Sequence, residues 1–136
     1  MNILVIDAQG GGIGKQLVSA LKSNFPAARI VAVGTNTIAT TAMLKAGADD
    51  AATGENAVVV NSRRADVIAG PVGIVIADAL LGEVTPLMAK AVAQSNARRI
   101  LIPINHCDNI VVGVGDLNIG KLIRDVVEEI GKLQKC

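Results

Sequence analysis

The chain has 136 residues, 51% of them hydrophobic but only 1% aromatic, and its 13 basic and 12 acidic residues leave a net charge of +1. This length predicts one domain, residues 1–136, with an aliphatic core of the kind found in sheets covered by helices on both faces. Scattered basic residues with Phe25 as the single aromatic disfavour nucleic-acid binding, and short, interrupted apolar runs disfavour a signal peptide or membrane span, so we expect a cytoplasmic protein.

The first seventy residues alternate β-branched runs with segments whose apolar residues recur at helical spacing, a pattern that predicts strands joined by crossover helices. Thr35 or Asn36 is placed to cap the second helix, and Gly47 to end it. The run Val58 to Val60 favours a strand locally, but the alternation requires a crossover helix there. The predicted strands cover residues 2–7, 29–33, 49–52 and 67–70, and the predicted helices cover residues 12–23, 37–46 and 57–63.

The second half of the chain predicts further helices and two strands. Thr85 and Pro86 are suited to the N-cap and the first turn of a helix, and Asp116 to the cap of the last helix. Residues 109–114 form an apolar run that follows the preceding strand too closely for a parallel crossover, so they predict an antiparallel edge strand. The remaining predicted elements are helices over residues 73–81, 86–94 and 117–133 and a strand over residues 99–104.

This order of elements predicts an α/β fold with a doubly wound, mainly parallel, Rossmann-like sheet, right-handed crossovers and the strand order 3-2-1-4-5. In such sheets ligands bind beyond the carboxyl ends of the strands, where the order reverses beside the first strand. The residues that this rule selects are 7–15, 34–36, 53–56, 70–73 and 105–107.

Residues 9–14, the glycine loop, place four glycines within five positions directly after the first strand. Glycine allows close approach of an anion, and the helix behind the loop directs free N–H groups and a partial positive charge to the same point. We therefore expect a phosphate site for NAD(P) or another nucleotide, while the alternative is that the glycines serve only close packing. The residues predicted to bind the cofactor are Asp7, Gln9, Gly10, Gly11, Gly12, Ile13, Gly14, Lys15, Gly34, Thr35, Asn36, Gly70 and Pro71.

The glycine loop departs from several familiar nucleotide-binding patterns. It lacks the first glycine of GxGxxG, and residues 34–36 carry no acidic residue for a ribose, so a phosphorylated ribose or a smaller nucleotide is tolerated better than NAD. It resembles the TGxxxGIG loop of short-chain dehydrogenases, but the chain has no tyrosine for their hydride chemistry. It also resembles the variant Walker A loop of MinD and ParA ATPases, although Gly10 replaces the signature lysine and Gln16 the threonine that binds Mg²⁺.

Three side chains are candidates for acid–base chemistry if the protein is a small enzyme acting on a phosphorylated metabolite: Asp7, Glu83 and His106. Asp7 is equally suited to fixing the glycine loop through its N–H groups, and Glu83 to capping the following helix or making a dimer contact. Cys107 points away from its neighbour His106 if the two continue a strand, so a covalent role is not expected. No cluster has metal-ligand spacing, and we expect no metal.

Four segments together carry a family resemblance: QGGGIGK at residues 9–15, GTN at 34–36, ATGENA at 52–57 and GPVGIVIA at 70–77. They resemble a family of short, uncharacterised bacterial proteins that is classed as a domain of unknown function. The resemblance covers nearly the whole chain and implies no activity.

The surface composition predicts self-association. A mean hydropathy of +0.48 and a net charge near zero leave surplus apolar surface on a small chain, so we expect a homodimer or higher homo-oligomer. A non-catalytic regulatory or scaffold oligomer without bound nucleotide is therefore the alternative to a nucleotide-binding protein.

Overall fold

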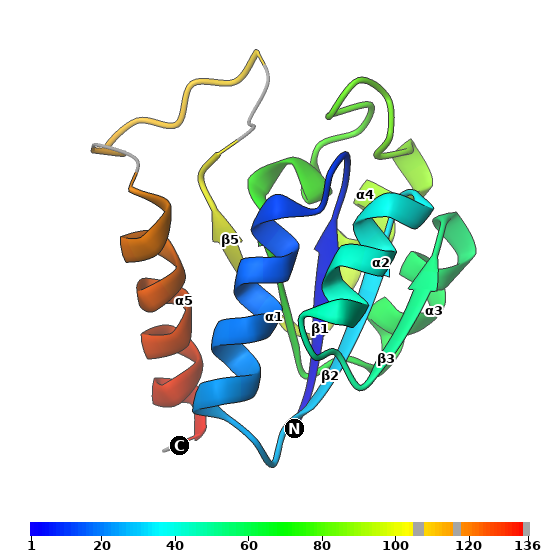
Figure 1. Cartoon of the computed structure of the whole chain (residues 1–136). Helices are drawn as coiled ribbons and strands as arrows, with labels where there is room; N and C mark the ends of the chain where they lie inside the picture. The colour runs from blue at the N-terminus through cyan, green and yellow to red at the C-terminus, as the bar shows by residue number, and fades with distance from the viewer. Residues whose placement is uncertain (105–107, 116–117, 135–136) are drawn as a thin grey trace.

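Five parallel strands form one sheet in the order β3-β2-β1-β4-β5 (Figure 1). The structure is a computed structural model that describes residues 1–104, 108–115 and 118–134. It confirms the predicted doubly wound, Rossmann-like α/β fold and its strand order. The strands are β1 (Asn2–Asp7), β2 (Arg29–Gly34), β3 (Asp50–Thr53), β4 (Val67–Pro71) and β5 (Arg98–Ile102); the helices are α1 (Gly12–Asn24), α2 (Thr37–Lys45), α3 (Glu55–Arg64), η1 (Val72–Val75, a 3-10 helix), α4 (Pro86–Gln94) and α5 (Ile119–Gln134).

The central strand β1 divides the core into two layers. Ile3 and Val5 pack with residues of α1, α2 and α5, whereas Leu4 and Ile6 pack with residues of α3, η1 and α4. Each of these four side chains is at most 2% exposed. Because successive strand residues point to opposite faces, an uninterrupted apolar run is what a strand with helices on both sides requires. Burial of each such side chain stabilises the fold by roughly 1.5–3 kcal/mol.

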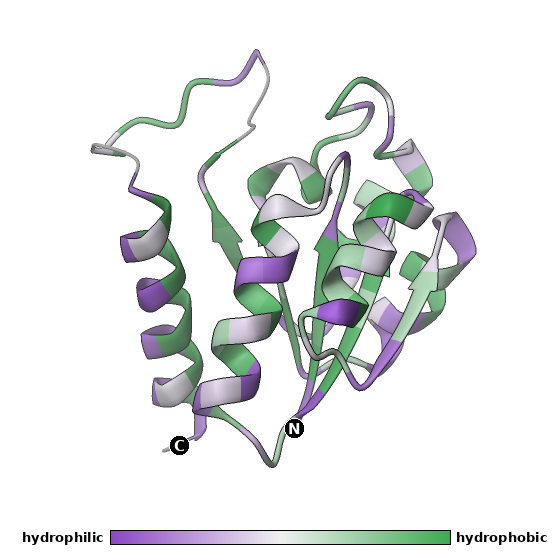
Figure 2. Cartoon of the chain, in the orientation of Figure 1, coloured by the Kyte–Doolittle hydropathy of each residue, from purple (hydrophilic) through white to green (hydrophobic). Residues whose placement is uncertain are grey.

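Helix α5 covers the sheet beside α1 and β5 (Figure 1). Its buried residues Ile123, Val126 and Ile130 recur at helical spacing. Figure 2 shows hydrophobic residues on the side of α5 that faces α1 and hydrophilic residues on the outer side. This amphipathic pattern places the apolar face of the helix against the core.

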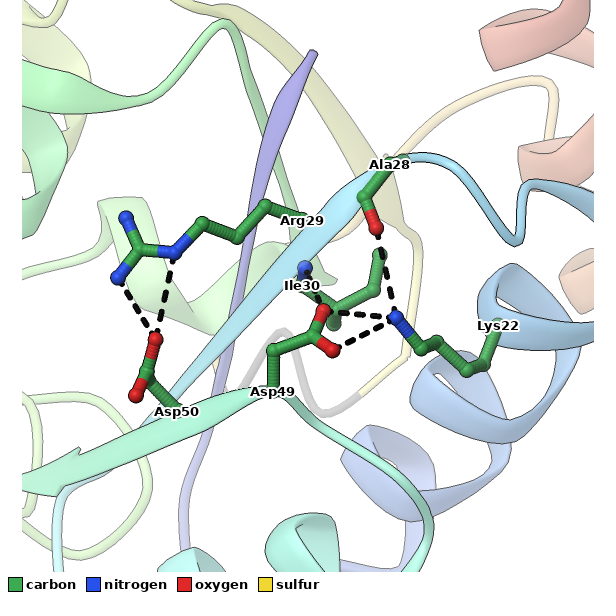
Figure 3. A network of polar contacts seen from close by, with 6 residues as sticks. All are labelled: Lys22, Ala28, Arg29, Ile30, Asp49 and Asp50. Carbon is green, nitrogen blue, oxygen red and sulfur yellow. Dashed lines mark hydrogen bonds and ion pairs between the residues drawn. The ribbon is translucent and has the colours of Figure 1, made fainter.

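A polar network joins the amino-terminal ends of β2 and β3 to the last turn of α1 (Figure 3). The Asp49 carboxylate accepts hydrogen bonds from Ile30 N at 2.8 Å and from Lys22 Nζ at 2.7 Å. These two contacts lower the pKa of Asp49, with the Ile30 N–H as the larger cause. A separate, more exposed pair joins Arg29 Nη2 to Asp50 Oδ2 at 2.7 Å. The network lies at the edge of the sheet opposite to the carboxyl ends of the strands.

The predicted antiparallel strand over residues 109–114 is wrong, because these residues form no strand and lie in the connection between β5 and α5. Ile110 and Val112 are 89% and 93% exposed. Strand propensity needs a paired neighbour to be realised, and this segment finds none among the described residues.

The predicted helix over residues 73–81 is also wrong beyond its first turn. The 3-10 helix η1 ends at Val75, and the chain then turns through left-handed backbone at Asp78, Leu80 and Leu81, with φ values of 65°, 58° and 58°. Left-handed residues cannot continue a right-handed helix. Within this turn Leu80 is buried, whereas Leu81 is 95% exposed.

The remaining predicted bounds differ from the observed ones by at most two residues. Thr85 caps α4 by accepting a hydrogen bond from Met88 N at 3.1 Å, as predicted. The predicted cap Asp116 lies outside the described residues, and Asn118 Oδ1 accepts from Lys121 N at 3.0 Å in the first turn of α5. Within the described ranges, no helix has both the length and the apolar character needed to cross a membrane.

Candidate functional site

The glycine loop lies at the carboxyl end of β1, between the connections that follow β2 and β4 (Figure 1). The strand order reverses here, because α1 leads to β2 on one side of β1 and α3 leads to β4 on the other. Gly11 is the N-cap of α1 with φ +72°, and its N–H donates to Ala8 O at 3.0 Å. The topology therefore brings together the segments that the sequence rule selected after the first, second and fourth strands.

Asp7 holds the start of α1 from the end of β1. Its Oδ1 accepts from Ala8 N at 2.8 Å and its Oδ2 from Gly14 N at 2.6 Å, and the residue is only 4% exposed. Burial raises the pKa of Asp7, although the N–H groups of Gly14, Ala8 and Ile13 oppose the shift. Because Gly11 has no side chain to cap α1, Asp7 supplies the acceptor that an N-cap residue normally provides.

Two of the loop glycines are required by packing. A Cβ on Gly11 would lie 2.8 Å from Ala39 Cα, and a Cβ on Gly14 would lie 2.6 Å from Met43 Sδ and 2.8 Å from Asp7 Cβ. Helix α2 therefore reaches the loop and α1 only because these positions carry no side chain. The alternative that the glycines serve only close packing therefore explains Gly11 and Gly14.

Gly10 and Gly12 differ from the other two. Both are exposed, a Cβ on either would meet nothing within 4 Å, and neither has a positive φ. Their N–H groups donate to no acceptor in residues 1–104, 108–115 or 118–134. Neither the backbone conformation nor packing against residues 1–104, 108–115 and 118–134 thus requires glycine at these positions.

Lys15 lies one turn into α1, three residues after Gly12, so both are on the same side of the helix. Its exposed side chain lines a surface groove of about 660 Å³ between α1 and α2, where Lys45 also lies. It lines a second groove, of about 500 Å³, between α1 and α5. The positive charge of Lys15 therefore stands beside the start of α1, on the side of the molecule that faces these grooves.

Glu83, in the connection between β4 and α4, joins three loops through one carboxylate oxygen. Its Oε1 accepts from Gln9 N at 2.9 Å, from Thr35 Oγ1 at 2.7 Å and from Asn36 Nδ2 at 2.7 Å. Partial burial acts to raise the pKa of Glu83, but these three hydrogen bonds outweigh it, so the pKa is lowered. Glu83 therefore stays ionised and holds the β4–α4 connection against the glycine loop.

Asn36 also connects the glycine loop with α2. Its Nδ2 donates to Gln9 O at 2.9 Å, and its Oδ1 caps α2 by accepting from Ala39 N at 2.9 Å. Asn36, rather than Thr35, is thus the cap of the second helix. Thr35 instead donates its hydroxyl to Glu83.

Gln9 is a non-glycine residue in the left-handed backbone conformation, with φ 52°. Residues of the β4–α4 connection adopt the same conformation. Such a conformation costs an L-residue on the order of 1 kcal/mol. Together with the three left-handed residues after η1, it concentrates strained backbone in two of the three loops that Glu83 joins. The hydrogen bonds of Glu83 help to offset this cost.

The structure places the other predicted site residues within the packing of the sheet. A Cβ on Gly34 would lie 2.7 Å from Asn36 O, so glycine permits the tight turn after β2. A Cβ on Gly70 would collide with the carbonyl oxygen of Ile6, so glycine permits β4 to pair closely with β1. Pro71 is buried at the end of β4 and Ile13 belongs to the core.

His106 and Cys107 lie outside the described residues. The described residues include no group of three or more His, Cys, Asp or Glu side chains that could hold a metal ion. The contact of Glu83 with Thr35 and Asn36 is the feature that sequence reasoning missed. This contact joins residues nearly fifty positions apart in the sequence. Only the predicted strand order could have indicated it, because the connection after β4 must pass beside the loops after β1 and β2.

Comparisons with known proteins add a structural neighbour and a family. No curated protein shows detectable sequence similarity to this chain. Among solved structures, the chain is similar to a dodecameric FMN-dependent UbiX-like decarboxylase from Escherichia coli O157:H7, with 14% identity and a TM-score of 0.45 over 100% of this chain and 95% of that one. The cofactor and the assembly are properties of that protein.

A protein-family profile matches residues 2–135, and its description is a domain of unknown function, DUF3842. The match takes in the glycine loop, the turn after β2 and the connection after β4. It confirms the resemblance that the four sequence segments indicated. The chain belongs to the DUF3842 family.

Proposed function

We propose that this protein binds a nucleotide, with its phosphate on the N–H groups of Gly10 and Gly12 and with Lys15 supplying positive charge. The observation that carries the proposal is the open space at these two glycines, which neither packing nor backbone conformation explains. Glycine at an exposed loop before a helix is suited to close approach of an anion.

The proposed phosphate contact uses only part of the glycine loop, because other N–H groups around it already donate to acceptors within the protein. Asp7 accepts the N–H groups of Ala8 and Gly14, and Glu83 accepts that of Gln9. A phosphate at Gly10 and Gly12 would still benefit from the partial positive charge at the N-terminus of the 13-residue helix α1. Burial raises the pKa of Asp7, although the N–H groups that its two oxygens accept oppose this shift.

A nucleotide suits this edge better than a simple anion because polar groups lie next to the proposed phosphate contact. Thr35, Asn36 and Glu83 meet beside Gln9 at the carboxyl ends of β1 and β2. In sheets of this topology, the crevice at the strand-order reversal accommodates the sugar and phosphates of nucleotides. The proposal assigns no reaction to the site.

Isothermal titration calorimetry tests the proposal with NAD, NADP, ATP, AMP, coenzyme A and FMN. We expect at least one of them to bind the wild-type protein, and Gly10→Val and Gly12→Val each to weaken that binding at least about tenfold, or about 1.4 kcal/mol. Both variants should keep the wild-type circular dichroism spectrum, because a Cβ at either position would meet nothing within 4 Å.

The matched control is Gly131→Val in α5, at another glycine whose Cβ would meet nothing within 4 Å but which lies far along the chain from the loop. This variant should bind as the wild-type protein does. Absence of binding by all six nucleotides at millimolar concentration, or Gly10→Val and Gly12→Val variants that bind as tightly as the control, would refute the proposal.

A further inference from the structure

We infer that Glu83 is the ribose-binding residue of this site: its carboxylate accepts hydrogen bonds from the vicinal hydroxyls of the bound nucleotide. This inference rests on the proposed nucleotide binding and names its specificity. It assigns to the β4–α4 connection a role that Rossmann-like sheets normally give to a residue at the end of the second strand.

The first observation is where the carboxylate lies. In this chain the segment after β2 is Gly34-Thr35-Asn36, which has no acidic residue. Glu83 Oε1 lies 2.7 Å from both Thr35 Oγ1 and Asn36 Nδ2, so folding brings a negative charge to the place where the local sequence lacks one. The same oxygen contacts Gln9 N, which precedes the proposed phosphate contact by one residue.

The second observation is how the carboxylate is held. Three donors from two loops fix Oε1, whereas Oε2 has no hydrogen-bond partner within the described parts of the chain. An acceptor that is anchored through one oxygen and presents the other loses little freedom when a ligand binds. Because Glu83 is only partly buried, a ligand at the sheet edge can approach it.

The β4–α4 connection is itself fixed to the core and does not act as a loose flap. Ala79 and Leu80 are 3% and 5% exposed, and turn hydrogen bonds join Asp78 N to Val84 O at 2.8 Å and Val84 N to Ala79 O at 3.2 Å. Glu83 is therefore presented from a preorganised turn.

The chemistry of an ionised carboxylate determines which ligand it selects. The hydrogen bonds that lower the pKa of Glu83 keep it charged at neutral pH, so it accepts hydrogen bonds and donates none. Ribose hydroxyls are suitable donors, whereas a 2′-deoxyribose offers one fewer. A 2′-phosphate would be repelled, which reverses the expectation drawn from residues 34–36 alone that a phosphorylated ribose is tolerated better than NAD. The predicted ligand class is therefore a nucleotide whose ribose carries both free hydroxyls.

The test uses ADP, 2′-deoxy-ADP and inorganic pyrophosphate as probes in calorimetric titrations of the full chain. We expect the wild-type protein to bind ADP about tenfold more tightly than 2′-deoxy-ADP. Glu83→Gln should reduce ADP affinity by a similar factor and remove most of this discrimination, while its affinity for pyrophosphate, which has no sugar, stays within about twofold of the wild-type value.

Glu55→Gln is the matched control. Glu55 Oε2 accepts from Thr85 Oγ1 at 2.6 Å, so it is another carboxylate anchored by a threonine, but it lies at the start of α3 and contacts neither Gln9 nor Asn36. This variant should retain the wild-type ratio of ADP to 2′-deoxy-ADP affinity. Thermal unfolding of both variants checks that they are folded.

Equal wild-type affinity for ADP and 2′-deoxy-ADP would overturn the inference without any variant. Tighter binding of ADP by Glu83→Gln would also overturn it, since the carboxylate would then be competing with the phosphate. Either result leaves the proposed function standing if ADP or pyrophosphate binding is still lost in Gly10→Val. If the wild-type protein binds neither ADP nor pyrophosphate, the inference fails, and the proposed function fails with it only if none of the six nucleotides binds either.

Discussion

Glycines that look alike in the sequence have different roles at the start of α1. Gly14 is enclosed by Met43 and Asp7, whereas Gly12, two residues earlier, faces open space. The difference arises because successive residues of the first helical turn point in different directions, and only one of these directions meets α2. A substitution therefore has opposite consequences at the two positions.

Gly14→Ala should destabilise the protein by about 1–3 kcal/mol, because Met43 can shift but Asp7 Cβ is held by the backbone hydrogen bonds of its carboxylate. Gly12→Ala should be neutral or stabilise by up to about 1 kcal/mol, because alanine is the better helix former. Urea denaturation of both variants measures the difference. Equal changes in the free energy of unfolding would contradict this assignment.

The two carboxylates at the glycine loop are also unlike each other. Asp7 and Glu83 both reach the glycine loop, as an acid–base pair would require. However, both carboxylate oxygens of Asp7 accept backbone N–H groups, and Asp7 is buried. Asp7 therefore acts on the helix start, which agrees with the structural alternative considered for it. Glu83 keeps one oxygen without a described partner and is the group to examine for contact with a ligand.

At the scale of elements, the polar network at the amino-terminal ends of β2 and β3 joins these two strands to α1. Asp49 contributes most to it, since one carboxylate accepts from Ile30 N and binds Lys22 Nζ through both oxygens. The Arg29–Asp50 pair beside it is more exposed, with side-chain exposures of 56% and 59%. Exposed pairs of this kind contribute little to stability, because solvent screens them.

Asp49→Asn should lower the free energy of unfolding by about 1 kcal/mol at neutral pH, and Asp50→Asn by less than about 0.5 kcal/mol. The pKa of Asp49 is lowered in the folded state, so its contribution is present above the pKa of the unfolded chain, about 4, and is lost as the pH falls through the folded value. Denaturation of wild type and Asp49→Asn from pH 7 to pH 2 should therefore show converging stabilities. A constant difference across this range would exclude a charge effect.

At the scale of the whole molecule, the connection between β5 and α5 exposes apolar surface. Ile110 and Val112 are almost fully exposed, and their β-branched pattern, which predicted a strand, finds no partner within the described chain. Exposed apolar segments of this kind often mark contacts with another chain. The expected homo-oligomer would give the segment such a partner.

Native mass spectrometry of the purified protein should show a homodimer or larger assembly. The double substitution of Ile110→Lys with Val112→Lys should shift the population towards monomer, because lysine ammonium groups are costly to bury in an apolar contact. Leu81→Lys, at a leucine that is 95% exposed in the β4–α4 connection, is the control and should leave the assembly unchanged. A monomeric wild-type protein, or an assembly unaffected by the double substitution, would refute the expectation.

Much of the architecture could be predicted from local patterns. Helical and strand periodicity predicted most elements within two residues, and the alternation of strands and helices predicted the sheet order. The predictions failed at residues 73–81 and 109–114, where apolar composition is compatible with several backbone conformations. In such segments contacts with the rest of the fold decide the conformation.

The sequence by itself determined the fold class and the edge of the sheet where the glycine loop lies, because periodicity, chain connectivity and strand handedness are local or nearly local properties. The family followed from the resemblance of four sequence segments and from the match to the family profile. Only the tertiary structure decided which glycines are packed and which are open, and that Asp7 caps α1. It also decided that Glu83 meets Thr35 and Asn36 from nearly fifty residues away. These features depend on contacts between segments distant in the chain, and neither residue type nor spacing encodes such contacts.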